Sequence, residues 1–74
     1  MRNRHFAKIE SENQTICLRV AEIESIGYDA DYISIGMSSG HKFLISLKED
    51  QNEMKTIDEI LSGYDIVVSA IYRK

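Results

Sequence analysis

The residues best suited to catalysis or metal binding are few and widely spaced. The chain has one cysteine, Cys17, and two histidines, His5 and His41, without the paired spacing that is typical of metal ligands. A nucleophilic Cys17 would need a basic neighbour, and only Arg19 shares its face of the predicted strand. A cysteine in a strand is most often a small buried hydrophobe, and a histidine beside a hairpin turn is most often exposed. We therefore expect no metal, no cofactor and no catalytic residue.

Two further patterns are better explained by turns than by chemistry. Asp29 and Asp31 flank a predicted turn, where aspartate is favoured for its own local hydrogen bonds. Gly36 and Gly40 lie in a predicted hairpin with no helix directly after it, unlike the glycines of a phosphate-binding loop. A catalytic pair of carboxylates also needs a cleft, for which a chain of 74 residues leaves little room. We expect that the protein is not an enzyme.

The charged residues are unevenly distributed along the chain. All 12 acidic residues lie between Glu10 and Asp65, whereas five of the nine basic residues lie near the termini, and the net charge is −3. Between residues 9 and 72, four basic residues against 12 acidic ones leave a net charge of −8. Such a body repels a phosphate backbone and attracts a basic partner. The surface expected to face that partner comprises Glu22, Glu24, Asp29 and Asp31.

The basic termini leave nucleic-acid binding open as an alternative. If the first and last strands are neighbours, their cations meet beside the rings of His5, Phe6 and Tyr72, on which bases can stack. The candidate contacts are Arg2, Arg4, Lys8, Arg73 and Lys74.

A β-hairpin over residues 31–47 must position many of these side chains. Hydrophobic residues alternate with polar or small ones in both halves of this segment, as in strands that bury one face. A two-residue turn would bring polar side chains to the buried face. A three-residue loop ending at Gly40 instead pairs Ile35 with Phe43, and Gly40 adopts the left-handed conformation without steric cost. We predict this second register.

The segment before the hairpin predicts three more strands. Residues 6–10 and 15–20 are expected to form the first two. The alternation breaks after residue 20, which indicates a bulge or a single tight turn at Ala21 and Glu22. A third strand over residues 23–29 follows.

A change of period after residue 48 predicts one helix over about residues 51–62. Asp50, with Glu53 three residues later, has the spacing of a capping box. Gly63 stands where a helix C-terminal glycine is expected. The hydrophobic stripe of this helix comprises Met54, Ile57, Ile60 and Leu61.

The last stretch, residues 64–73, is hydrophobic on both faces. A strand of this kind is either central in a covered sheet or part of an interface. Because one helix cannot cover both faces of a sheet, either the sheet curls into a partial barrel or a second copy covers it. We predict an α+β fold with a small antiparallel sheet of about five strands, one helix and a C-terminal strand.

Length and composition indicate a single domain over residues 1–74, with residues 1–5 as a flexible basic tail. The hydrophobic fraction of 43% is typical of a folded globule, and cores this small often gain stability by association. No hydrophobic run approaches the roughly 18 residues that span a bilayer. The basic N-terminus also lacks the hydrophobic segment of a signal peptide. We expect a cytoplasmic protein.

These observations predict a non-catalytic protein-binding or regulatory module that self-associates, such as an inhibitor or adaptor of a larger protein. Two copies would pair edge strands or pack sheets face to face. The residues expected to mediate self-association are Tyr64, Ile66, Val67, Val68, Ile71 and Tyr72.

The pattern over residues 6–61 resembles the FlbD family of small flagellar regulatory proteins. The matching stretches are Ile23-Glu24-Ser25-Ile26, then Tyr32-Ile33-Ser34-Ile35 with its turn at Gly40, then the acidic helix start. The resemblance implies short strands followed by a helix. The chain departs from the family in its turns, which are Glu12-Asn13-Gln14 and Ser38-Ser39-Gly40 where the family favours Asn-Gly, and its final strand has no counterpart. No functional residue is carried over.

Overall fold

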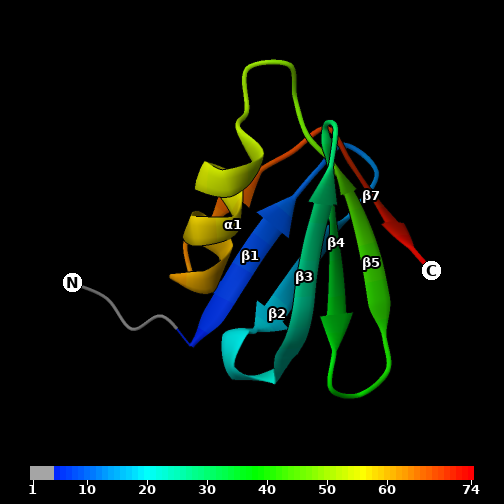
Figure 1. Ribbon diagram of the computed structural model, residues 1–74, viewed down its shortest axis with the longest axis vertical. Coiled ribbons are helices and arrows are strands. Elements are labelled where there is room, and N and C mark those ends of the chain that lie inside the picture. The colour runs from blue at the N-terminus through cyan, green and yellow to red at the C-terminus, as the bar shows by residue number, and fades with distance from the viewer. Residues whose placement is uncertain (1–4) are drawn as a thin grey trace.

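The structure is a computed structural model that describes residues 5–74. Over this range the chain forms seven strands, one α-helix and one 3₁₀ turn (Figure 1). In chain order they are β1 (Phe6–Glu10), β2 (Thr15–Arg19), η1 (Val20–Glu22), β3 (Ile23–Asp29), β4 (Tyr32–Met37), β5 (Lys42–Ser46), α1 (Glu53–Leu61), β6 (Ile66–Val67) and β7 (Ala70–Arg73). The fold is α+β, as the sequence predicts.

The strands form two sheets around one core. The first has the order β2-β1-β6 and the second, which is antiparallel throughout, has the order β3-β4-β5-β7. The helix α1 packs against β1 and β6 of the first sheet and β4 of the second, and Figure 1 shows it on the side of the molecule opposite β7. The core residues are Ala7, Ile9, Ile16, Leu18, Ile33, Ile35, Met37, Phe43, Ile45, Leu47, Ile60, Ile66, Val68 and Ile71.

The β4–β5 hairpin confirms the predicted register. Ile33 pairs with Ile45 and Ile35 with Phe43, so all four side chains point into the core. The loop closes with a hydrogen bond of 2.9 Å from the Gly40 N–H to the Met37 carbonyl. Gly40 has a φ of 98°, the left-handed conformation that a three-residue loop requires.

The break after β2 is a 3₁₀ turn, η1, as expected for the step in the hydrophobic pattern. A bulge follows at Glu24, where the β3–β4 pairing shifts between Ile23 and Ser25. Cys17 is exposed rather than buried, because the alternation of β2 turns Ile16 and Leu18 inward and Cys17 outward.

The C-terminal stretch is not one strand but two, in different sheets. β6 pairs in parallel with β1, whereas β7 pairs antiparallel with β5. Ile66 and Val68 are buried on alternate positions, and the next buried residue is Ile71, three positions on. The hydrophobic pattern therefore changes phase where the chain crosses from one sheet to the other.

This crossing explains why the segment looked hydrophobic on both faces. The predicted single sheet of about five strands is replaced by two sheets that share one core. β2 and β7 are not paired, so the sheets do not close into a barrel.

The helix begins two residues later than predicted, and Asp50 is not its cap. Asn52 is the N-cap, and its side-chain oxygen accepts a hydrogen bond of 2.9 Å from the Lys55 N–H. At the other end Gly63 adopts a φ of 77°. The Gly63 N–H bonds to the Ile60 carbonyl and the Tyr64 N–H to the Glu59 carbonyl, which is a Schellman motif.

The buried face of α1 is narrower than the predicted stripe. Thr56 and Ile60 are buried and Ile57 is partly buried, but Met54 is 59% exposed and Leu61 49% exposed. A nine-residue helix that contacts both sheets buries only the line of side chains between them, so Met54 and Leu61 remain in solvent.

Candidate binding surfaces

The two sheets leave four edge strands, and two of these edges are covered by side-chain amides. On β7 the Asn13 amide donates to the Ile71 carbonyl at 2.9 Å and its oxygen accepts from the Ile71 N–H at 3.2 Å. Gln14 donates to the same carbonyl at 2.8 Å. Asn13 therefore pairs with Ile71 much as a neighbouring strand would, which protects this edge from other strands.

The edge at β6 is covered in a similar way. Gln51, in the segment before α1, donates its side-chain amide to the Val67 carbonyl at 2.8 Å. The same side chain accepts from the Lys48 N–H at 2.7 Å, so the segment before the helix is fixed against the sheet.

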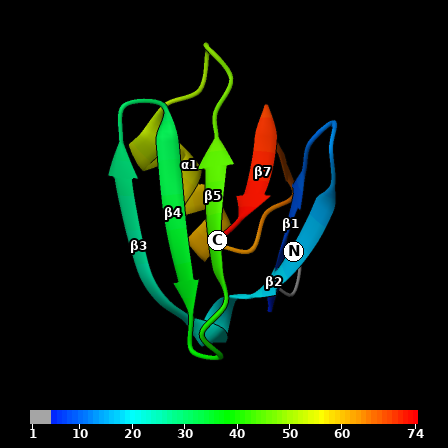
Figure 2. The same ribbon diagram turned by 90° about the vertical axis from the view of Figure 1, so that its right-hand side faces the viewer.

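β3 is an open edge. It is the longest of the described strands, with seven residues, and it pairs with β4 alone. Figure 2 shows it at the margin of its sheet with no strand on its outer side. Because Asp29 and Tyr32 flank a two-residue turn, the alternation of the ladder directs the N–H and C=O groups of Ile26 and Tyr28 away from β4.

The predicted acidic surface lies along this open edge. Glu22 ends η1, Glu24 forms the bulge, Asp29 ends β3 and Asp31 lies in the turn that follows. All four residues are exposed. The residues that the sequence assigned to a basic partner thus lie along β3 and in the turns at its two ends.

Glu53 adds a fifth carboxylate at one end of this edge. Its Oε2 accepts a hydrogen bond of 2.9 Å from the backbone N–H of Asp31. This bond, and a second one from its own backbone N–H, hold the pKa of Glu53 below its ordinary value of 4.5, because both favour the ionised carboxylate. Glu53 therefore stays ionised beside the turn, and it connects the first turn of α1 to the β3–β4 hairpin.

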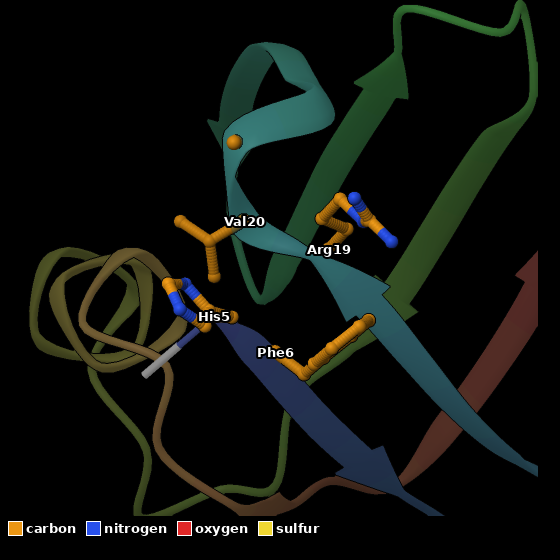
Figure 3. Close-up of a pocket in the computed structure, with 5 residues that line it drawn as sticks. His5, Phe6, Arg19 and Val20 are labelled. Atoms are coloured by element: carbon orange, nitrogen blue, oxygen red, sulfur yellow. The ribbon is translucent and has the colours of Figure 1, made fainter. Parts of the chain in front are cut away.

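A second surface, of opposite charge, lies where the ends of β1 and β2 approach those of β5 and β7. The Arg19 guanidinium carbon lies 5.5 Å from the centroid of the Phe6 ring, and that of Arg73 lies 5.7 Å from the centroid of Phe43. A hollow of about 440 Å³ is lined by His5, Phe6, Arg19, Val20 and Ala21. Figure 3 shows Phe6 projecting from β1 and Arg19 from the end of β2, with His5 and Val20 beside them.

An adjoining hollow of about 330 Å³ shares Phe6 and Arg19 with the first and adds Cys17, His41 and Arg73. We call Phe6, Arg19, His41, Phe43 and Arg73 the arginine–phenylalanine surface. Sequence reasoning missed Arg19 here, although the signal was available: in a β1–β2 hairpin Phe6 pairs directly with Arg19.

The structure only partly gathers the residues expected to contact nucleic acid. Arg2 and Arg4, and most of the predicted tail over residues 1–5, lie outside the described residues. β1 and β7 belong to different sheets and are not neighbours. Lys8 points outward from β1, opposite Cys17, whereas Arg73 lies with Arg19 in the adjoining hollow.

The core of the single chain buries half of the residues expected to mediate self-association. Ile66, Val68 and Ile71 are buried, whereas Tyr64, Val67 and Tyr72 are 43–50% exposed. Only the last three are accessible to a second copy, and they belong to three different segments.

The structure does place Cys17 and His41 in one hollow, together with Glu22 and two arginines. The His41 ring Nδ1 is hydrogen-bonded to the Ser39 hydroxyl at 2.9 Å, and no hydrogen bond joins it to Cys17 within residues 5–74. In the same range no three His, Cys, Asp or Glu side chains are arranged to hold a metal ion. The absence of catalysis and of a cofactor stays a prediction.

The chain matches no protein-family model, no curated protein and no solved structure. The likeness to the FlbD family therefore stays a resemblance of pattern. Within residues 5–74 there is no helix with the length and hydrophobicity to span a membrane.

Proposed function

We propose that this chain is a non-catalytic protein-binding module whose β3 edge takes up an extended, basic segment of a partner protein by strand addition. The observation that carries the proposal is an open seven-residue edge strand bordered by acidic residues. Strand addition uses backbone hydrogen bonds for affinity and alternate side chains for specificity.

The contrast among the edges supports β3 as the site. Asn13 and Gln14 cover β7, and Gln51 covers β6. β2 has five residues and lies beside the arginine–phenylalanine surface. Proteins usually block exposed edges because these recruit other strands, so a long edge left open is a candidate for recruitment.

The charges favour a basic partner over a second copy. In a two-fold antiparallel pairing of β3 with itself, centred near Gly27, Glu24 of one copy would lie within about one residue of Asp29 of the other. These carboxylates are not directly opposite each other, but two acidic edges brought side by side repel each other. Lysine or arginine at the same positions of a partner would instead be attracted.

The expected affinity is modest. Ile26 and Tyr28 together offer four backbone groups, and each hydrogen bond contributes about 0.5–1.5 kcal/mol net. The resulting total of about 2–6 kcal/mol corresponds to roughly millimolar binding. Any tighter binding must come from charge and side-chain contacts. A weak and reversible contact of this kind suits a regulatory module.

The substitution Tyr28→Pro tests the site through its backbone. It removes an N–H that points away from β4, so the ladder within the sheet is kept, and the proline ring obstructs an added strand. Tyr28→Ala is the matched control, because it removes the same half-exposed ring but keeps the N–H. We expect a basic β-forming peptide of alternating lysine and valine to bind the proline variant at least about tenfold more weakly than the alanine variant, as measured by calorimetry.

Charge variants test the class of partner. Glu24→Lys with Asp29→Lys should abolish binding of the same peptide. Glu12→Lys with Asp58→Lys makes the same change in net charge away from β3, and should reduce binding only slightly. Equal losses in the two double variants would show that the peptide responds to overall charge, and would remove β3 as the site.

A further inference from the structure

We propose that the arginine–phenylalanine surface binds single-stranded nucleic acid. The inference goes beyond the proposed protein-binding role, and it does not depend on that role because it uses other strands. It rests on how the two arginines are held, on the local charge, and on the shape of the two hollows.

Both arginines are held over rings that come from separate sheets. Arg19 lies over Phe6 at the end of the β1–β2 hairpin, and Arg73 lies over Phe43 between β5 and β7. Phe43 is buried, whereas Phe6 is 52% exposed. A guanidinium placed over a ring loses less side-chain freedom on binding a ligand, and its planar fork suits phosphate oxygens.

The local charge is opposite to that of the body. The adjoining hollow is lined by Arg19, Arg73 and His41 with one acidic residue, Glu22, whereas the chain as a whole carries −3. Lys42 and Lys74 do not add to this charge, because they line a separate hollow with Ser25 of β3 and Ser34 of β4. A phosphate backbone is therefore attracted to the two arginines and repelled by the acidic residues elsewhere on the chain.

The rings favour a nucleic acid over an acidic peptide. Half-exposed Phe6 and exposed His41 present faces on which bases can stack, and stacking on such side chains supplies much of the affinity for single strands. A glutamate or aspartate side chain gains little from a ring. The hollows, of about 440 and 330 Å³, are in the size range of small-ligand sites and are open to solvent, so an unstacked base can reach the rings.

The test uses the full chain and fluorescently labelled oligothymidine and oligouridine of about 12 nucleotides, within the usual site size of about 4–16. Fluorescence anisotropy is measured over a range of salt concentrations. We expect Arg19→Ala with Arg73→Ala to weaken binding at least about tenfold. The slope of log K against log salt should become less negative by about 1.4, because each phosphate contact to a single strand contributes about 0.7.

Two control pairs separate this site from charge in general. Lys48→Ala with Lys55→Ala removes the same charge from the segment after β5 and from α1, and should change the affinity less than about threefold. Arg19→Lys with Arg73→Lys keeps the charge and a long stem over Phe43, so this variant should fold. It should keep the salt slope but still bind several-fold more weakly, because lysine lacks the planar fork.

Three results would overturn the inference: no binding at low salt, equal binding of duplex and single strand, or binding of polyglutamate as tight as that of the oligonucleotides. If Arg19→Lys with Arg73→Lys bound the oligonucleotides with full affinity, the surface would act only through its charge, and the inference would fail as well. The β3 variants Glu24→Lys with Asp29→Lys should still bind the oligonucleotide through Arg19 and Arg73. Failure of one proposal can therefore be distinguished from failure of the other.

Discussion

At the scale of single residues, Glu53 and Asn13 make side-chain contacts with distant backbone that the hydrophobic pattern does not reveal. Glu53 accepts from the N–H of Asp31, 22 positions earlier in the chain, and Asn13 pairs with Ile71, 58 positions later. Both side chains satisfy backbone groups at points where no neighbouring strand does so.

Glu53 should make stability depend on pH. Its folded pKa is lowered by the hydrogen bonds from Asp31 and from its own backbone. Its stabilising contribution is therefore present above the ordinary value of 4.5 and is lost as the pH falls through the lower folded pKa. We expect Glu53→Gln to lose less stability than the wild type between neutral and acid pH, as measured by urea unfolding at a series of pH values. Glu49→Gln removes a carboxylate that takes no part in this contact, so its stability should depend on pH as that of the wild type does. If the stability of Glu53→Gln also depended on pH as in the wild type, Glu53 would not be the group responsible.

Asn13 should contribute measurably to stability. Asn13→Ala removes both hydrogen bonds between the Asn13 side chain and the Ile71 backbone. The Ile71 N–H is then unpaired, which costs about 1–3 kcal/mol. Glu12→Ala, at the neighbouring exposed position, should cost less than about 0.5 kcal/mol. Chemical denaturation measures both, and equal values would show that the edge of β7 does not need this cover.

At the scale of elements, the helix and the last two strands depend on context that local pattern does not contain. The hydrophobic period of this segment correctly predicted a helix, and Gly63 correctly predicted where it ends. The width of the buried face, however, depends on where the two sheets lie. The phase change between Val68 and Ile71 was visible in the sequence. The same pattern predicts a single strand that is hydrophobic on both faces, because a change of sheet has no local marker in the sequence.

The narrow buried face of α1 has a direct test. Ile60→Ala should cost about 2–5 kcal/mol because Ile60 is fully buried. Met54→Ala should cost less than about 1 kcal/mol, since Met54 is largely exposed. Similar losses of stability at the two positions would indicate that Met54 is packed as the sequence predicts, and would contradict the narrow buried face.

The hairpin shows how much the sequence could determine. Its register followed from keeping four hydrophobic residues on one face and from the need for Gly40, both of which are local facts. The exposed positions of Glu24, Asp29 and Asp31 could also be read from the sequence, because the three residues lie within a single strand and its turn; their role in binding a partner stays a prediction. The arginine–phenylalanine surface was not found, because it joins strand ends from two sheets.

At the scale of the whole molecule, the two sheets cover each other's hydrophobic faces. The sequence predicted self-association because one helix could not cover a sheet that was hydrophobic on both sides. That reason no longer applies once residues 64–73 divide between two sheets. What remains of the expected self-association depends on the exposed side chains of Tyr64, Val67 and Tyr72, and we now predict a monomer instead.

Sedimentation tests this prediction. Given the self-covering core, we expect the mass of one chain, 8.5 kDa, at tens of micromolar. A dimer that dissociates on Val67→Asp would instead support an interface on β6.

Amide hydrogen exchange at Ile26 and Tyr28, with and without the basic β-forming peptide, tests the central claim most directly. The N–H groups of these two residues point away from β4, so we predict fast exchange in the unbound chain and clear slowing when the peptide is added. The Gly27 amide, which faces β4, should be protected in both states. Peptide binding that leaves the exchange of Ile26 and Tyr28 unchanged would contradict strand addition at β3.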